Sequence, residues 1–356
     1  MDTSSQIIMY LGFAMAAYSV VGNDVIQTLG TFLTSNEKRP WYLLWGYAAT
    51  ILTVVLVYGW IVNDGDVSYM KLIGNASKGY SFANPAYPLP NPLTWWYLLP
   101  PIILLVITRF GIPVSTTFLI LTFFGTASLS NFDMSRGFGE FLIEFFTADQ
   151  FSSMLTKSLL GYAVASITAI IAYTLIAERL ERRFYQTELE GSSREGLLWS
   201  AAQWVSTGFL WSQWLIQDFA NIYAYLPRKV SVTEMIASLV VILGLLAYIF
   251  YQRGGAIQGI VKSKTNTQDI RSATIIDFIY GIVLFFFKEL NDVPMSTTWV
   301  FIGLLAGREY ALRYRFDDKK ISRATHKGIG LDAMKATLGL VVSIILVVMM
   351  QYVRGL

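Results

Sequence analysis

The sequence contains no cysteine, a single histidine and little charge. Without cysteine the chain has no disulfides, no thiolate metal sites and no cysteine nucleophiles. The histidine, His326, lies in a predicted basic loop beside Arg323 and Lys327, so a histidine-based metal site or catalytic triad is excluded as well. Charged residues make up 14% of the chain, whereas soluble domains carry about 25%. These absences remove most catalytic chemistries and argue against a soluble protein.

Long apolar segments dominate the chain instead, with 54% hydrophobic residues and a mean hydropathy of +0.49. Several approach the ~20 residues that cross the apolar core of a bilayer. We therefore predict an all-α polytopic protein, embedded in a cell (inner or plasma) membrane and in contact with lipid. The net charge of +3 is small, and no nucleic-acid partner is expected. The predicted segments are 6–34, 41–62, 94–108, 113–130 and 153–177, then 197–227, 231–251, 273–290, 294–312 and 333–353.

The two sets of five segments indicate an internal duplication. In each set the first segment contains an acid and the fourth begins with Ser-Thr-Thr. We predict repeat 1 at 1–177, a cytoplasmic connector at 178–196 and repeat 2 at 197–356. Because five crossings are an odd number, the repeats would be inverted, as in many secondary transporters. The distribution of lysine and arginine favours an external N-terminus. The Ser-Thr-Thr segments could instead be re-entrant hairpins, which leaves the number of crossings open.

Each half carries an acid with amide neighbours in its first segment. Asp24 and Gln27 are three residues apart and share a helix face, as do Asp218 and Asn221. A charge at membrane depth is costly and usually functional, and carboxylate and amide oxygens suit small hard cations. We also expect Gly22 to let the helix unwind and free backbone carbonyls. The alternative is polar residues that only join helices. The predicted sodium ligands are Asn23, Asp24, Gln27, Asp218 and Asn221.

The two Ser-Thr-Thr segments predict an anion site. Pro113 and Pro294 stand two residues before the serines; proline favours a helix start and serine or threonine an N-cap. A helix N-terminus presents unpaired N–H groups and the positive end of its dipole, which bind phosphate-like anions. Two copies that converge on a pseudo-two-fold axis would bind a tetrahedral oxyanion; helix capping alone is the alternative. The predicted oxyanion ligands are Ser115, Thr116, Thr117, Ser296, Thr297 and Thr298.

Other charged residues lie close to these segments. Arg109 and Lys288 could attract an anion, but the favoured interpretation is that their side chains extend to the membrane interface. Glu289 and Asp292 are either a further cation or proton site or a surface-exposed pair. The segment 63–93, rich in glycine, asparagine and proline, is predicted to be an external loop without recognisable chemistry.

Together these motifs resemble the inorganic phosphate transporter (PiT) family, which includes sodium- and proton-coupled phosphate carriers and some sulfate permeases. The resemblance rests on Gly22–Val25 (Gly-Asn-Asp-Val), Asp218–Asn221 (Asp-Phe-Ala-Asn) and the two Pro-x-Ser-Thr-Thr segments, and it covers both halves. It implies that the acid and amide residues hold coupling cations and that the hydroxyls hold the oxyanion. It also implies a homodimer.

The chain departs from the family pattern at five positions that bear on specificity, and at one of them Asp292 takes the place of Gly111. Gln27 and Gln217 stand where the family has asparagine, and Phe118 and Trp299 replace a histidine that often follows Ser-Thr-Thr. These departures leave the anion, phosphate or sulfate, and the coupling ion, sodium or proton, undecided.

The leading hypothesis is a symporter that carries inorganic phosphate with sodium by alternating access. Cations at Asp24 and Asp218 would offset the charge of the anion, so the site would need no fixed lysine or arginine. No cofactor beyond the coupling ions is expected. The alternatives are a sulfate permease of the same family, a passive anion channel, and an intramembrane enzyme acting on lipid phosphates, for which the sequence offers no obvious base or nucleophile.

Overall fold

The computed structural model describes residues 1–110, 112, 114–126, 138–176, 193–254, 269–290, 294–316 and 323–354, and four residues of the connector (183, 184, 187 and 189). Within these residues the regular secondary structure is helical, and no strand occurs. Five helical segments are long and apolar enough to cross a membrane: Thr3–Val25, Trp41–Val62, Asp149–Leu175, Val232–Tyr251 and Ile270–Phe287. The prediction of an all-α polytopic membrane protein is confirmed.

Each predicted segment contains a helix. The first half contains α1 (Thr3–Ser35), α2 (Trp41–Val62), the 3-10 helices η1 (Ala76–Lys78) and η2 (Trp95–Leu98), α3 (Leu99–Arg109), α4 (Thr116–Thr126), α5 (Phe138–Thr147) and α6 (Asp149–Ile176). The second half contains α8 (Arg194–Tyr223), α9 (Val232–Tyr251), α11 (Ile270–Leu290), α12 (Thr297–Phe316) and α13 (Arg323–Arg354). Since α13 begins at Arg323, His326 lies in a helix, and its predicted position in a loop was wrong.

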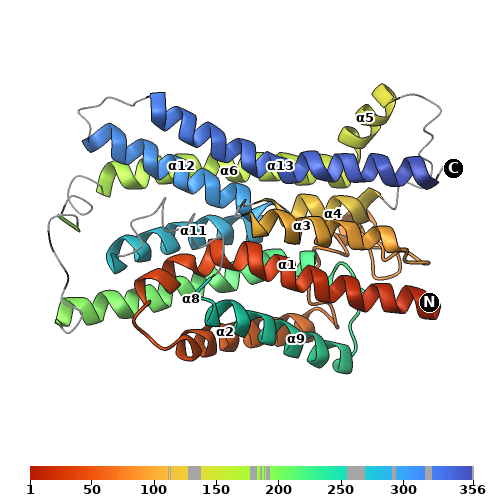
Figure 1. Ribbon diagram of the computed structural model, residues 1–356, viewed down its shortest axis with the longest axis horizontal. Helices are drawn as coiled ribbons and strands as arrows, with labels where there is room; N and C mark the ends of the chain where they lie inside the picture. Colours follow the sequence, from red (N-terminus) through yellow and green to blue (C-terminus); the bar gives the residue numbers. More distant parts are fainter. Residues whose placement is uncertain are drawn as a thin grey trace.

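The helices form layers around a central pair. Figure 1 shows α1 and α8 running in opposite directions through the middle, with α2 and α9 along one side and α6, α12 and α13 along the other. Helix α1 packs against α9 as α2 packs against α8, and α4 packs against α13 as α12 packs against α6. The two ends of the chain lie at the same end of the molecule. These two contacts therefore each have a counterpart in which the two halves exchange places.

The helices that begin with Ser-Thr-Thr come from opposite ends of the molecule. Figure 1 places α3 and α4 in the half that contains the termini and α11 and α12 in the other half. Helices α3 and α4 have 11 residues each, or about 16 Å, and they pack together. The described part of each helix is shorter than the ~30 Å core of a bilayer. Helices α11 and α12 are longer, with 21 and 20 residues.

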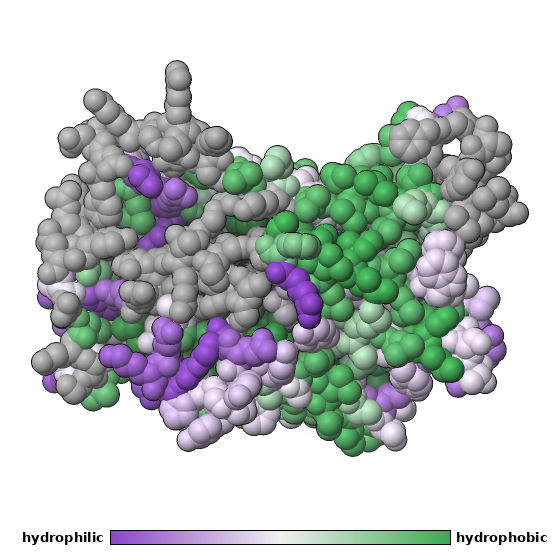
Figure 2. Space-filling view, in the orientation of Figure 1, coloured by the Kyte–Doolittle hydropathy of each residue, from purple (hydrophilic) through white to green (hydrophobic). Residues whose placement is uncertain are grey.

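The outer surface is apolar, whereas polar side chains gather inside. Figure 2 shows hydrophobic residues over the middle and right of one face, while strongly hydrophilic residues gather toward the end away from the termini. Large apolar side chains point outward from the surface helices, for example Val54, Ile61, Leu175 and Val240. Such a surface suits contact with lipid chains. The interior polar residues lie mainly on α1, α4 and α8, and they form the candidate site.

Candidate ion and oxyanion site

The two predicted acids lie in the middle of the central helix pair. Asp24 on α1 is 1% exposed and Asp218 on α8 is fully buried. Helix α1 runs unbroken through Gly22, so the predicted unwinding was wrong, and the backbone carbonyls there stay in the helix. The glycine faces α3, where an added Cβ would lie 3.9 Å from Thr108. Any oxygen ligands that α1 supplies beside Asp24 must therefore come from its side chains.

The carboxylate of Asp24 accepts hydrogen bonds from its own helix, α1, and from the start of α4. Its Oδ1 accepts from Asn23 Nδ2 at 2.6 Å and from Gln27 Nε2 at 3.3 Å, both on α1. Its Oδ2 accepts from the Thr116 hydroxyl at 2.5 Å, at the start of α4. Asn23 Nδ2 also donates to the carbonyl of Val114 at 2.8 Å. The first acid and the first Ser-Thr-Thr segment therefore form one polar cluster.

Asp218 connects the same segment to the second half. Its Oδ1 accepts from Asn221 Nδ2 at 2.7 Å and from the Thr117 hydroxyl at 3.4 Å. Asn221 Nδ2 reaches Thr116 Oγ1 at 2.9 Å as well. One continuous network thus runs from Asp218 to Asp24 through an amide and a hydroxyl.

The two Ser-Thr-Thr segments cap their helices in the same way. Ser115 Oγ accepts from the backbone N–H of Phe118 at 3.2 Å, and Ser296 Oγ accepts from that of Trp299 at 3.3 Å. In an N-cap of this kind the serine satisfies one free N–H of the first turn. The remaining N–H groups of that turn have no partner inside the helix. Both helix starts therefore have backbone donors that the helix itself does not use, although the N–H of Ser296 donates to the Ser158 hydroxyl at 2.9 Å.

The segments also bond to each other across the two halves. The Thr117 hydroxyl donates to the carbonyl of Met295 at 3.3 Å, and the Thr298 hydroxyl donates to that of Val114 at 3.2 Å. All six predicted oxyanion ligands are buried, with at most 2% of each residue exposed. The structure thus brings the starts of α4 and α12 together beside both acids.

Several buried oxygens in this cluster accept no hydrogen bond. They are Asn23 Oδ1, Gln217 Oε1, Asp218 Oδ2 and Asn221 Oδ1. An unsatisfied buried polar group costs about 1–3 kcal/mol, and four acceptors without donors match the needs of a cation. Gln217 was not among the predicted ligands. The signal was present, because Gln217 precedes Asp218 as Asn23 precedes Asp24.

A third buried acid escaped the sequence analysis. Asp277 on α11 is 1% exposed and accepts from the hydroxyls of Thr31 on α1 at 2.6 Å and Thr207 on α8 at 2.5 Å. Thr31 lies seven residues after Asp24, which is about 10 Å along the helix. Asp277 is charged within an otherwise apolar stretch of α11, and that position was the available signal.

The other predicted charged residues do not join the site within the described part of the chain. Arg109 is exposed at the end of α3, as its interfacial interpretation requires. The side chains of Lys288 and Glu289, and the whole of Asp292, lie outside the described residues. The aromatic residues Phe118 and Trp299 pack edge to face, with ring centroids 5.8 Å apart. They form an apolar contact between α4 and α12.

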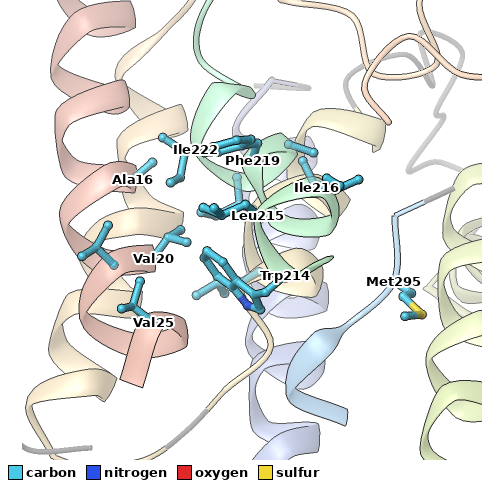
Figure 3. Packing of buried hydrophobic residues seen from close by; sticks show 14 of the residues in the cluster. Ala16, Val20, Val25, Trp214, Leu215, Ile216, Phe219, Ile222 and Met295 are labelled. Carbon is cyan, nitrogen blue, oxygen red and sulfur yellow. The ribbon is translucent and has the colours of Figure 1, made fainter. Parts of the chain in front are cut away.

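Apolar side chains enclose the polar cluster. Figure 3 shows Val20 and Val25 on α1 facing Trp214 and Leu215 on α8. Met295 lies in the segment that leads into α12. These side chains are at most 2% exposed. In such a low-dielectric setting, charges interact strongly and an unbalanced charge is costly.

The ligand set is specific in its chemistry. Among the described residues, no three His, Cys, Asp or Glu side chains come together. Each carboxylate is instead accompanied by amides and hydroxyls, which are neutral oxygen ligands. Such a set suits a hard, weakly held cation and an exchangeable anion.

The comparisons with known proteins bear on the fold. The chain is similar to a solved structure, "The sodium-dependent phosphate transporter", with a TM-score of 0.55 and 16% identical residues, over 98% of this chain and 100% of that chain. No protein-family model matches the sequence, and no curated protein matches it. The chain therefore has the fold of a phosphate transporter, as the motifs of both halves predict.

Proposed function

We propose that the protein is a secondary active symporter that carries inorganic phosphate together with sodium ions. The observation that carries this proposal is the network that joins Asp24, Asp218 and both Ser-Thr-Thr segments, the second of them through Thr298 and the Val114 carbonyl. A cation at the carboxylates and an anion at the helix starts would then lie in contact. The two ions would enter and leave together because each offsets the charge of the other.

The cation positions follow from the oxygen atoms. Asn23, Asp24 and Gln27 supply one set, while Asp218 and Asn221 supply the second, and the unpartnered oxygens lie in both. Gln217 adds an amide oxygen to the second set. Sodium accepts such mixed carboxylate and amide coordination, and binding would relieve the cost of the unpartnered oxygens.

The oxyanion position follows from the two helix starts. The free N–H groups and dipoles of α4 and α12 point their positive ends at the same region. Two ionised carboxylates close by would repel an anion in the absence of cations. We infer that sodium binds first, and that its presence permits phosphate to bind to Ser115, Thr116, Thr117, Ser296, Thr297 and Thr298 or to the N–H groups beside them.

Asp277 extends the proposed cation path beyond the central site. It lies between α1 and α8, and its carboxylate accepts a hydrogen bond from one threonine hydroxyl on each helix. Both threonines lie on the face of the site toward the start of α8, because Thr207 precedes Asp218 on α8 and Thr31 follows Asp24 on the antiparallel α1. We assign Asp277 to the passage of cations between the central site and that face.

We propose two inverted repeats, 1–177 and 197–356, joined by the connector 178–196. The antiparallel central helices and the exchange of packing partners between halves support this proposal. Inverted repeats that place half-helices at the membrane midplane are typical of transporters with alternating access. In this proposal the protein is a homodimer in a cell membrane and has no enzymatic activity.

The named structural neighbour supports phosphate and sodium over the alternatives. A sulfate permease remains the second candidate, because sulfate presents the same four oxygens to the helix starts. The buried carboxylates argue against a passive anion channel. Their negative charge would repel a passing anion and slow its flux, and a channel has no use for a cation site.

The test is uptake of radiolabelled phosphate into proteoliposomes, with and without an inward sodium gradient, and with excess unlabelled sulfate. We expect sodium-driven accumulation that resists sulfate. Accumulation of labelled sulfate in place of phosphate would make the protein a sulfate permease. Flux that only equilibrates, with no cation gradient required, would make it a channel.

A further inference from the structure

The interface between α1 and α8 is polar on one side of the two central acids. Thr31 on α1 and Thr207 on α8 donate to Asp277 at 2.6 and 2.5 Å. One turn further along each helix, the amide of Gln203 on α8 donates to the hydroxyl of Ser35 on α1. All of these except Ser35 are at most 1% exposed. These five residues, the polar seam, run toward the end of the molecule where α1 ends and α8 begins.

A hydrogen-bonded latch closes the outer end of the polar seam. Asn36 Nδ2 donates to Gln203 Oε1 at 2.8 Å, and Asn36 Oδ1 accepts from Arg39 Nε at 3.0 Å. Arg39 Nη2 donates to the Ser200 hydroxyl at 3.3 Å, and its guanidinium lies 5.6 Å from the ring centroid of Trp204. Asn36 is 4% exposed, whereas Arg39 is exposed. Asn36 and Arg39, the latch, therefore separate the seam from the surface.

The same interface is apolar on the other side of the acids, toward the chain termini. Ala16 and Val20 on α1 are fully buried, and Figure 3 shows Ala16 facing Ile222 on α8. Phe13 meets Tyr223 edge to face, with ring centroids 5.7 Å apart. Apolar side chains cannot replace the water around an ion, so an ion that enters them pays a large desolvation cost. A cation therefore leaves more readily along the polar seam.

The internal duplication does not account for this difference. The spacing that relates Asp24 to Asp218 assigns each seam position on α1 and α8 a counterpart on the other side of the acids. The pairs are Thr31 with Tyr225, Thr207 with Phe13 and Gln203 with Met9. The counterparts are at most 5% exposed, and the Tyr225 hydroxyl donates to the carbonyl of Tyr97 at 2.6 Å. The halves thus share the acids but differ where the seam lies.

We propose that the polar seam is the route of the coupling cation between the central site and the end of the molecule where α8 begins, and that the latch gates it. This inference rests on the proposed function. The oxygens of Thr31, Thr207 and Gln203 replace one another as ligands of a small hard cation along the route. Asp277 forms no ion pair with any described residue, and a buried carboxylate of this kind is typical of ion pathways. Its charge repels the anion, so the two ions leave the central site by different routes.

The first test uses the absence of cysteine from the chain. Thr31→Cys and Ala17→Cys each place one thiol on α1, on opposite sides of Asp24 and at equal distance from it in the sequence. The purified variants are treated in detergent with a cationic methanethiosulfonate reagent and with an anionic one of similar size. We expect the cationic reagent to modify Thr31→Cys several-fold faster than the anionic one, and sodium to slow the reaction. Ala17→Cys should stay unmodified.

The latch is tested in the same variants. Asn36→Ala removes the amide that holds Gln203 and Arg39, so it should speed the modification of Thr31→Cys several-fold and leave Ala17→Cys unmodified. Asn63→Ala is the matched control, because Asn63 caps the end of α2 as Asn36 caps that of α1, and its amide bonds to Gly59 of its own helix. Equal rates with the two reagents, or no modification of Thr31→Cys in either background, would overturn the inference.

A transport measurement separates the route from the central site. Gln203→Met gives position 203 the side chain of its counterpart, and it should slow sodium-driven phosphate uptake several-fold. The equilibrium affinity for phosphate in sodium should keep its wild-type value. Gln213→Met is the control, since Gln213 is a buried glutamine of the same helix whose amide bonds to Ser212; it should change neither quantity.

Normal uptake by Gln203→Met, or a loss of affinity equal to the loss of uptake, would rule out a separate route through Gln203. Absence of uptake by the wild-type protein would instead contradict the proposed function. The thiol modification does not depend on uptake, so it tests the seam in either case.

Discussion

Asn221 on α8 donates a 2.9 Å hydrogen bond to the hydroxyl of Thr116, and that hydroxyl donates to Asp24 on α1 at 2.5 Å. An amide of the second half and a carboxylate of the first are thus joined through a residue of the first Ser-Thr-Thr segment. Any ion that displaces one of these bonds changes the environment of the other acid. In the proposed function, this shared network would couple the binding of the cation to that of the anion.

Asp24→Asn or Asp218→Asn should abolish sodium-driven phosphate uptake and leave the protein in the membrane. Each substitution removes a charge that holds a cation but keeps the size and much of the hydrogen bonding of the side chain. Uptake and the amount of protein in the vesicles are measured together. Asp64→Asn is a control, because Asp64 is exposed. Transport near the wild-type rate in either site variant would remove that acid from the mechanism.

Thr116→Val should raise the apparent KM for sodium by about tenfold or more, because it removes a hydrogen bond to a charged group worth about 1.5–3 kcal/mol. Valine keeps the shape of threonine. The matched control is Thr53→Val on α2, whose hydroxyl bonds only to its own helix at Ala49. The measurement is uptake as a function of sodium concentration. An unchanged sodium dependence would separate the hydroxyl from cation binding.

Ser115→Ala combined with Ser296→Ala should raise the apparent KM for phosphate. Each serine caps a helix start, and loss of a cap costs about 1 kcal/mol, or about fivefold. The helix starts should become less well ordered as anion sites. Ser231→Ala removes an equivalent cap from α9, away from the site, and should leave the KM unchanged. If Ser231→Ala raised the KM for phosphate as much as the double substitution does, the cause would be a general loss of stability.

Asp277→Asn should slow uptake several-fold at limiting sodium. The amide can still bond to Thr31 and Thr207, so the contact between α1, α8 and α11 survives while the charge is lost. Initial rates at low and high sodium are compared, with unfolding temperature as the check on structure. If the rates stay normal at low sodium, Asp277 only joins the three helices.

Much of the fold could be predicted from the sequence because the signals are local. Apolar runs of membrane length give the helices, and the repeated Ser-Thr-Thr segments locate the starts of α4 and α12. The hydrogen bond from Thr116 to Asp24 was not predicted, because it depends on how α1 and the start of α4 pack together. The prediction of unwinding at Gly22 failed because a glycine inside a helix costs only about 1 kcal/mol, which packing against α3 offsets.

The remaining features depend on contacts between distant residues. The sequence gives no hint that the loop between α2 and α3 is tied to the segment after α8 by Arg228, which donates to the carbonyl of Tyr87. Asp277, Thr31 and Thr207 lie on three different helices, and their hydrogen bonds form only when those helices pack together. The unpartnered oxygen of Gln217 depends on where the neighbouring donors lie. None of these relationships follows from hydropathy or from a motif.

The most direct test of the account is the affinity of the purified protein for phosphate as a function of sodium concentration, measured by equilibrium binding. If sodium and phosphate occupy one network, phosphate should bind tightly in sodium and weakly when choline replaces it. Asp24→Asn should remove this difference. Equal phosphate affinity in sodium and choline, for the wild-type protein, would contradict the central claim that the two ions share a site.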